Sequence, residues 1–172
     1  MSKRLLFTLA AAVLAACSAG GPAGPDGGSP DQSGAHAPVP VTRLAPGPYS
    51  FTYSSGYHEP ARLVVRSEAE WRRVWGKLHE RVHPQPELRR VDFSRHAVLV
   101  AALGSRSSGG YSILVDSVSD AGGELRAVVR KVSPGAGCVV TQAFTQPVDV
   151  VLVPASGKRV RFVERDEVLD CR

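Results

Sequence analysis

The sequence predicts an α+β domain that is mainly β, an antiparallel sheet or sandwich with one amphipathic helix, preceded by a signal peptide and a disordered linker. Most segments after about residue 60 alternate apolar and polar residues or form short apolar runs, which is typical of strands. One segment instead repeats apolar residues at helical spacing. Many strands joined by short turns, with a single helix, favour a sheet that packs against that helix.

The helix is expected over about residues 67–82. Ser67 and Glu70 have the spacing of a capping box, in which the serine caps the first turn and the glutamate reaches back. Pro84 ends the helical pattern. The apolar face of the helix consists of Trp71, Val74, Trp75, Leu78 and Val82. We expect the two tryptophans to pack on the sheet, although they could also line a ligand pocket.

The strands are expected in seven short segments. Residues 97–103 are almost continuously apolar, which predicts a strand buried on both faces. The other expected strands are residues 62–66, 111–118, 125–132, 139–140, 148–153 and 159–163.

The first residues have the pattern of an export signal. Lys3 and Arg4 precede an apolar run, residues 5–14, that is about half the length needed to cross a bilayer. The run ends in Leu-Ala-Ala-Cys, which resembles the lipobox of bacterial lipoproteins. We therefore expect residues 1–16 to be removed and Cys17 to be acylated. An ordinary secretory signal beside an incidental cysteine is the alternative.

Acylation of Cys17 makes the lipid bilayer the first expected partner, because two or more acyl chains anchor a protein stably. Ser18 is not an acidic retention signal, so in a cell with two membranes we expect the outer membrane. Residues 17–47 are rich in Gly, Pro and Ala and predict a linker. A single globular domain is expected over residues 48–172.

Charge and cysteine content narrow the function further. The formal net charge is +5, and removing Lys3 and Arg4 leaves +3, which is too modest to indicate nucleic-acid binding. With Cys17 lipidated, Cys138 and Cys171 remain in an oxidising compartment and are expected to form a disulfide. A free reactive thiol and an intermolecular bridge are the alternatives.

The segment His-Glu-Arg-Val-His, residues 79–83, matches a zinc-binding pattern in which two histidines lie on one helix face and the glutamate acts as general base. Pro84 directly follows and disfavours helical geometry at His83. Arg81 places a cation between the two histidines. We therefore expect no metal and no cofactor, and keep a metallopeptidase with His79 and His83 as ligands as an alternative.

A glycine-rich loop, residues 104–113, separates two expected strands. A strand follows it, whereas phosphate-binding loops are followed by a helix. The loop also lacks the serine midway between glycines that marks a nucleophile elbow. It is either an exposed recognition loop or a turn with special backbone angles. A protease inhibitor that presents Ser105–Gly110 is a further alternative.

Several segments together resemble the PrcB C-terminal domain family over about residues 60–155. They are Asp92-Phe93, Leu103-Gly104, residues 108–113, Pro134-Gly135, residues 141–147 and residues 150–154. The family usually has an aromatic residue where this chain has Val148. The resemblance implies a non-catalytic lipoprotein subunit that supports the maturation or stability of a cell-surface protease complex.

We therefore expect a non-enzymatic domain that binds a protease or another envelope protein. The residues expected to shape the partner surface are Gly109, Gly110 and Tyr111, with Thr145 and Pro147 at an adjoining irregular edge. The alternative is that all five have a purely structural role.

Overall fold

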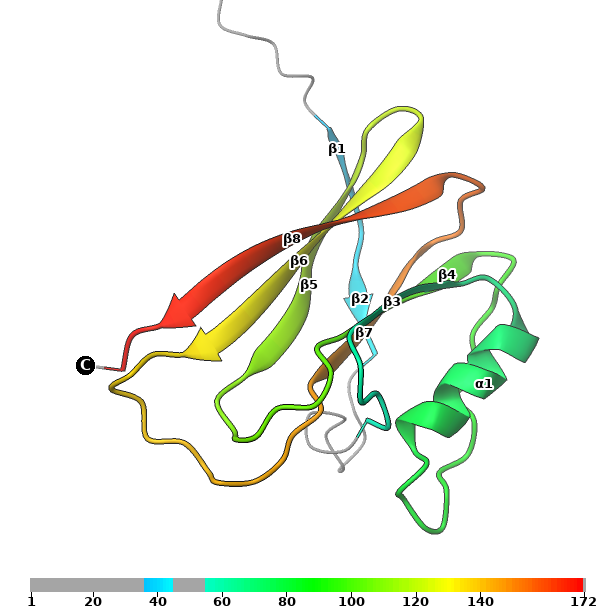
Figure 1. Cartoon of the computed structure of the whole chain (residues 1–172). Helices are drawn as coiled ribbons and strands as arrows, with labels where there is room; N and C mark the ends of the chain where they lie inside the picture. Colours follow the sequence, from blue (N-terminus) through cyan, green and yellow to red (C-terminus); the bar gives the residue numbers. More distant parts are fainter. Residues whose placement is uncertain (1–35, 45–54, 172) are drawn as a thin grey trace, which may run out of the picture. The chain divides into compact units, whose positions relative to one another are not determined.

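The computed structural model describes residues 36–44 and 55–171. Its strands form two four-stranded sheets, in the orders β1-β5-β6-β8 and β2-β7-β4-β3. The elements are β1 (Ala37–Val39), β2 (Thr42–Arg43), β3 (Ala61–Val65), α1 (Glu68–Leu78), β4 (His96–Ala102), β5 (Ser112–Asp120), β6 (Glu124–Pro134), β7 (Val148–Pro154) and β8 (Arg159–Leu169) (Figure 1). The mainly β, sandwich-like fold with a helix is confirmed.

The predicted signal peptide and Cys17 lie outside the described residues. Within residues 36–44 and 55–171, no helix is long and apolar enough to cross a bilayer.

The strand β4 separates two apolar cores. Its residues Leu99 and Ala101 pack between the sheets with side chains from β5, β6 and β7. The alternate residues Val98 and Val100 pack against α1 on the other side. All four are 0% exposed, because successive side chains of a strand point to opposite faces. The predicted strand buried on both faces is therefore confirmed.

The helix α1 covers the outer face of the sheet that contains β3 and β4 (Figure 1). Ser67 is its N-cap and accepts a hydrogen bond from the amide of Glu70 at 3.3 Å. The Glu70 carboxylate accepts from the amide of Arg66 at 2.8 Å. The predicted capping residues thus both bond the start of the helix, although Glu70 reaches one residue further back than expected.

The helix ends at Leu78, four residues earlier than the predicted end at about 82. His79 is the C-cap, and the amide of Glu80 already bonds the carbonyl of Lys77 at 3.3 Å. The amide of Val82 bonds the carbonyl of His79 at 3.0 Å in the same three-residue pattern. The chain therefore leaves the α-helix through tight turns, which often close helix ends.

Two short strands lie before residue 48, in the segment that the sequence assigns to the linker. Strand β1 pairs with β5 of one sheet and β2 pairs with β7 of the other, so residues 37–43 pass from sheet to sheet. Val39 and Val41 pack against the core, and Leu44 is 3% exposed. The composition of residues 37–43 predicts a linker although they form strands. Short edge strands are stabilised mainly by backbone pairing, so they need few apolar residues that a sequence pattern could reveal.

Arg43 fixes this segment to both sheets. Its guanidinium donates to both carboxylate oxygens of the buried Asp149, at 2.8 and 3.0 Å, and to the carbonyl of Val115 at 3.1 Å. The same carboxylate accepts from the amide of Val115 at 2.8 Å. Asp149 lies on β7 and Val115 precedes the register shift in β5, so this bidentate pair joins the two sheets beside that irregularity.

The C-terminal strand departs from the predicted antiparallel arrangement. Strand β8 runs parallel to β6, while the other strand pairs are antiparallel. The chain crosses from β7 in one sheet to β8 in the other. This crossing sets the direction in which β8 runs beside β6. The predicted Cys138–Cys171 disulfide is present and joins the loop after β6 to the end of β8.

Candidate partner-binding surface

The glycine-rich loop, residues 104–111, requires glycines at particular positions. Gly104 and Gly110 have φ angles of +82° and +83°, which residues with a Cβ rarely adopt. Gly109 is buried, and a Cβ there would collide with the Thr141 hydroxyl. The predicted residues Gly109 and Gly110 therefore give this loop the shape that lets it pack against the chain opposite.

The chain opposite is the segment 135–147, which follows β6. Arg106 and Thr145 exchange two backbone hydrogen bonds, at 2.8 and 3.0 Å, as an isolated antiparallel bridge. The amide of Gly109 donates to the carbonyl of Thr141 at 2.9 Å. The Thr145 hydroxyl donates to the carbonyl of Ser108 at 2.9 Å. We call these two segments, residues 104–111 and 135–147, the paired loops.

Thr145 and Pro147 lie inside the paired loops. Thr145 is 2% exposed, and Pro147 is less than 2% exposed. The structure therefore places them where they hold the loops together, and not at the surface. Tyr111 is half-buried, and the guanidinium of Arg106 lies 5.7 Å from its ring centroid. Of the five predicted residues, only Gly110 is exposed.

Gln146 anchors the paired loops to the chain before β3. Its side-chain oxygen accepts from the amide of Gly56 at 3.1 Å, which fixes the orientation of the side-chain amide. Its nitrogen therefore donates to Nδ1 of His58 at 2.8 Å and approaches the Ser105 hydroxyl at 3.4 Å. Nδ1 of His58 thus acts as acceptor, and its Nε2 lies 3.7 Å from the carboxylate of Glu80.

A shallow cavity of about 310 Å³ opens over this network. It is lined by His58, Arg81, Ser105, Phe144 and Gln146. Its walls therefore come from four separate segments of the chain, which no local sequence pattern brings together.

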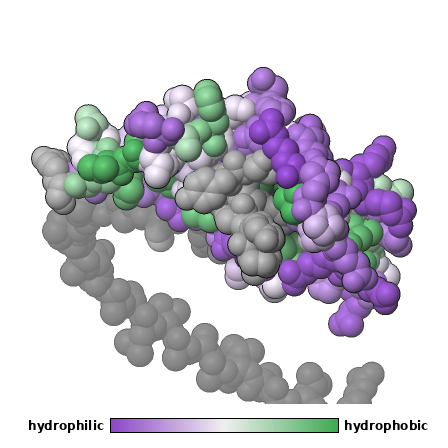
Figure 2. Space-filling model, turned by 90° about the horizontal axis from the view of Figure 1, so that it is seen from below, coloured by the Kyte–Doolittle hydropathy of each residue, from purple (hydrophilic) through white to green (hydrophobic). Residues whose placement is uncertain are grey.

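The large exposed apolar side chains of the described residues lie on the paired loops and on the end of β8. Phe144 is 81% exposed and Val139 is fully exposed, and both belong to the segment 135–147. Val168 is 69% and Leu169 46% exposed, at the end of β8 that the disulfide joins to the same segment. Figure 2 shows one end of the visible face to be mainly apolar or neutral and the other mainly hydrophilic.

The sequence prediction is wrong for residues 139–140. They are predicted as a strand, but the structure has an irregular loop there. Two adjacent valines suggest a buried strand, whereas here the side chain of Val139 is fully exposed. Residues 139–140 therefore belong to the irregular edge that the sequence predicts before Pro147, and this edge carries exposed apolar side chains.

The zinc-binding pattern does not lie on a helix. The helix ends at Leu78, so His79 and His83 are not one turn apart on a helix face. His79 is 6% exposed, its ring centroid is 4.2 Å from that of Trp75, and its Nδ1 lies 2.9 Å from the carbonyl oxygen of Trp75. Among residues 36–44 and 55–171, no three His, Cys, Asp or Glu side chains are grouped so that they could hold a metal ion.

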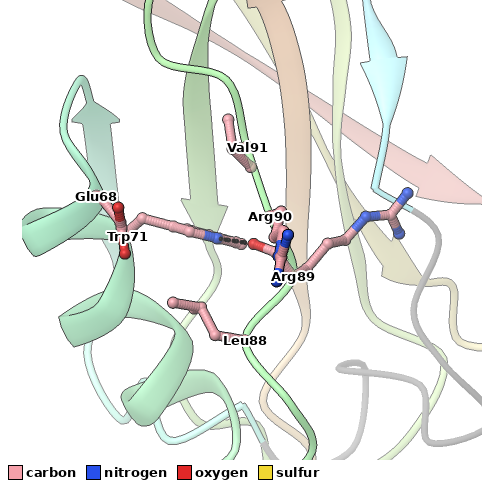
Figure 3. A pocket seen from close by; sticks show the side chains of 6 residues that line it. All are labelled: Glu68, Trp71, Leu88, Arg89, Arg90 and Val91. Carbon is pink, nitrogen blue, oxygen red and sulfur yellow. Dashed lines mark hydrogen bonds between the residues drawn. The ribbon is translucent and has the colours of Figure 1, made fainter.

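A second cavity, of about 400 Å³, lies between α1 and the chain that follows it (Figure 3). Trp71 forms part of its wall, and its indole N–H donates to the carbonyl of Arg89 at 2.7 Å. Trp71 is 1% exposed, so the predicted packing role is confirmed even though the ring borders a cavity. The indole of Trp75 likewise donates to the carbonyl of Pro86 at 3.1 Å.

The fold and the paired loops define a small two-sheet β domain whose irregular loops present apolar side chains beside a polar network. A family model described as PrcB C-terminal matches residues 97–154. The matched segment runs from β4 to β7 and includes both paired loops. No curated protein and no solved structure matches the chain.

Proposed function

We propose that this protein is a bacterial lipoprotein, anchored to a membrane of the cell envelope through acylated Cys17, whose non-catalytic domain binds an envelope protein. The resemblance of residues 14–17 to a lipobox supports the anchor. The family match supports a role in a protein complex in general. A protease complex is the partner that the family resemblance favours.

Phe144 is the observation that carries the binding proposal. Phe144 is 81% exposed and shares the segment 135–147 with the fully exposed Val139, and exposed apolar side chains that gather in one region indicate an interaction site. Phe144 directly precedes the buried Thr145 and Gln146, whose hydrogen bonds hold the backbone in place. A large apolar side chain on a rigid base loses little entropy on binding, which is typical of residues that contribute strongly to interfaces.

Site-specific photo-crosslinking tests this surface. A photoreactive amino acid at position 144 of the lipidated protein is expected to yield an adduct with one envelope protein in intact cells. The same amino acid at Arg72, which is exposed on α1, serves as the matched control. Phe144→Ser in the unlabelled protein should reduce co-purification of that partner at least tenfold. Equal adducts from both positions would contradict the proposal.

The membrane anchor is tested separately by intact mass spectrometry of the native protein. We expect a chain that lacks residues 1–16 and carries a diacylglyceryl group, or three acyl chains in total, on Cys17. Cys17→Ser should release the protein from the membrane fraction. An unmodified thiol at position 17 would remove the anchor from the proposal without affecting the binding surface.

A further inference from the structure

The strand β8 is a long exposed edge. It has 11 residues, lies at the end of its sheet, and pairs only with β6 among the described strands (Figure 1). The strand at the opposite edge of the same sheet, β1, has three. A long edge strand is a template for another strand unless its side chains prevent pairing.

The backbone of β8 shows which residues are available at this edge. The carbonyl of Leu169 accepts from the amide of Gly135 at 3.0 Å, and the carbonyl of Glu167 accepts from the Ser133 hydroxyl at 3.4 Å. Odd-numbered carbonyls of β8 therefore face β6. Because backbone groups alternate along a strand, the even-numbered residues from 160 to 168 direct their N–H and C=O groups to the open edge.

We propose that β8 pairs antiparallel with β8 of a second copy of this chain, about a two-fold axis at Glu164. In such an isologous contact, the β1-β5-β6-β8 sheet of one copy joins the same sheet of the second copy to form one continuous eight-stranded sheet. The proposal does not depend on the envelope partner or on the membrane anchor.

In this register the pairs formed by Arg161 and by Val160 are complementary, whereas Phe162 lies opposite Asp166. With the axis at Glu164, Arg161 lies opposite Glu167 of the second copy. By symmetry, Glu167 lies opposite Arg161 of the second copy, so the contact contains this pair of opposite charges twice. Val160 lies opposite Val168, which is 69% exposed in the single chain. The side chains of Arg161 and Glu167 are 69% and 43% exposed. Charges of opposite sign that face each other, and apolar side chains that face each other, stabilise neighbouring strands.

The neighbouring registers are less favourable. Moving the axis to Val163 places Arg161 opposite Arg165 of the second copy, twice. Moving it to Arg165 places that arginine opposite itself and Glu164 opposite Asp166. Like charges directly opposite one another destabilise a strand pair.

The proposed axis places the two Glu164 side chains opposite each other, but each already has cations of its own chain. Its carboxylate lies 2.6 Å from the guanidinium of Arg62 and 2.7 Å from the ammonium of Lys131. These contacts neutralise the negative charge at the centre of the pair.

Cysteine crosslinking of the full-length protein in membranes tests the geometry. Glu164→Cys places two thiols opposite each other, and we expect a disulfide-linked dimer on mild oxidation. Asp166→Cys is the matched control, because its two copies lie about 14 Å apart, four residues along the strands. A dimer with Glu164→Cys alone supports the proposal. No dimer, or equal yields from both variants, overturns it.

Charge reversal tests the register. Arg161→Glu and Glu167→Arg should each weaken self-association of the full-length protein in detergent at least tenfold by analytical ultracentrifugation, and the double variant should restore it. Glu167 also bonds Arg130 within the chain at 3.1 Å, so thermal unfolding of each variant checks that folding is retained. A folded double variant that stays as weak as the single variants, or a wild-type protein that is monomeric at every concentration, contradicts the proposal.

Discussion

At the scale of single residues, the Arg43–Asp149 pair makes the sharpest prediction. Asp149 is 6% exposed, and removing Arg43 leaves its carboxylate with the amide of Val115 as partner. Breaking a buried ion pair leaves an uncompensated charge, and the partial exposure of Arg43 moderates this cost. We expect Arg43→Ala to lower the free energy of unfolding by about 2 kcal/mol in urea denaturation.

Arg72→Ala provides the control for that measurement. Arg72 pairs with Glu68 on the exposed side of α1, with both side chains more than 60% exposed. Exposed pairs contribute little, so this variant should stay within about 0.5 kcal/mol of the wild type. If the two variants lose equal stability, Arg43 does not hold the two sheets together.

Gly109 decides whether the paired loops can pack. A Cβ at this position collides with the Thr141 hydroxyl, whereas a Cβ at Gly123 meets nothing within 4 Å. Overpacking of this kind costs about 1–3 kcal/mol. Gly109→Ala should therefore lower stability by that amount and reduce partner capture, and Gly123→Ala should do neither. If Gly109→Ala changes neither the free energy of unfolding nor partner capture, close packing of the paired loops is not required.

At the scale of elements, the start of α1 makes stability depend on pH. The amide of Arg66 donates to the Glu70 carboxylate and lowers the pKa of Glu70 below its ordinary value of 4.5. A lowered pKa in the folded state means that the stabilisation is present above the ordinary value and is lost as pH falls through the folded value. Glu70→Gln should therefore lower stability at neutral pH and reduce the loss of stability on acidification.

The control for Glu70 is Glu68→Gln, in the same helical turn. The Glu68 carboxylate accepts from the exposed side chain of Arg72, and not from a backbone amide. Denaturant midpoints measured between pH 3 and 7 distinguish the two variants. The expectation fails if both variants show the same pH dependence.

At the scale of the whole molecule, truncation tests where the folded domain begins. Removing residues 1–35 should leave the midpoint of thermal unfolding unchanged, because β1 starts at Ala37. Removing residues 1–44 deletes β1, β2 and the Arg43 side chain, and should lower stability by about 2 kcal/mol or more. Equal melting curves would return the boundary to the predicted position at residue 48.

The earlier start also limits the reach of the domain from a membrane. If Cys17 is the anchor, about 20 residues separate it from Ala37, and a fully extended chain of that length spans about 70 Å. A partner that binds the paired loops, as proposed, must therefore lie no further from the bilayer than this distance plus the size of the domain.

Periodicity and local chemistry are enough to predict several parts of this protein from its amino-acid order. The apolar run of β4, the alternation along β5, the start of α1 at Ser67 and the pairing of the two C-terminal cysteines all depend on neighbouring residues or on compartment chemistry. The glycine-rich loop is also visible in the sequence, and the structure shows why two of its positions need glycine: Gly110 has a positive φ angle, and a Cβ at Gly109 would collide with the Thr141 hydroxyl.

Local patterns do not predict which distant segments lie together in the folded chain. The parallel direction of β8, the crossing of residues 37–43 between the sheets and the burial of Thr145 depend on contacts between residues far apart in the chain. The exposure of Phe144 has the same origin, because hydropathy is a property of a residue, while exposure depends on what the rest of the chain packs against it.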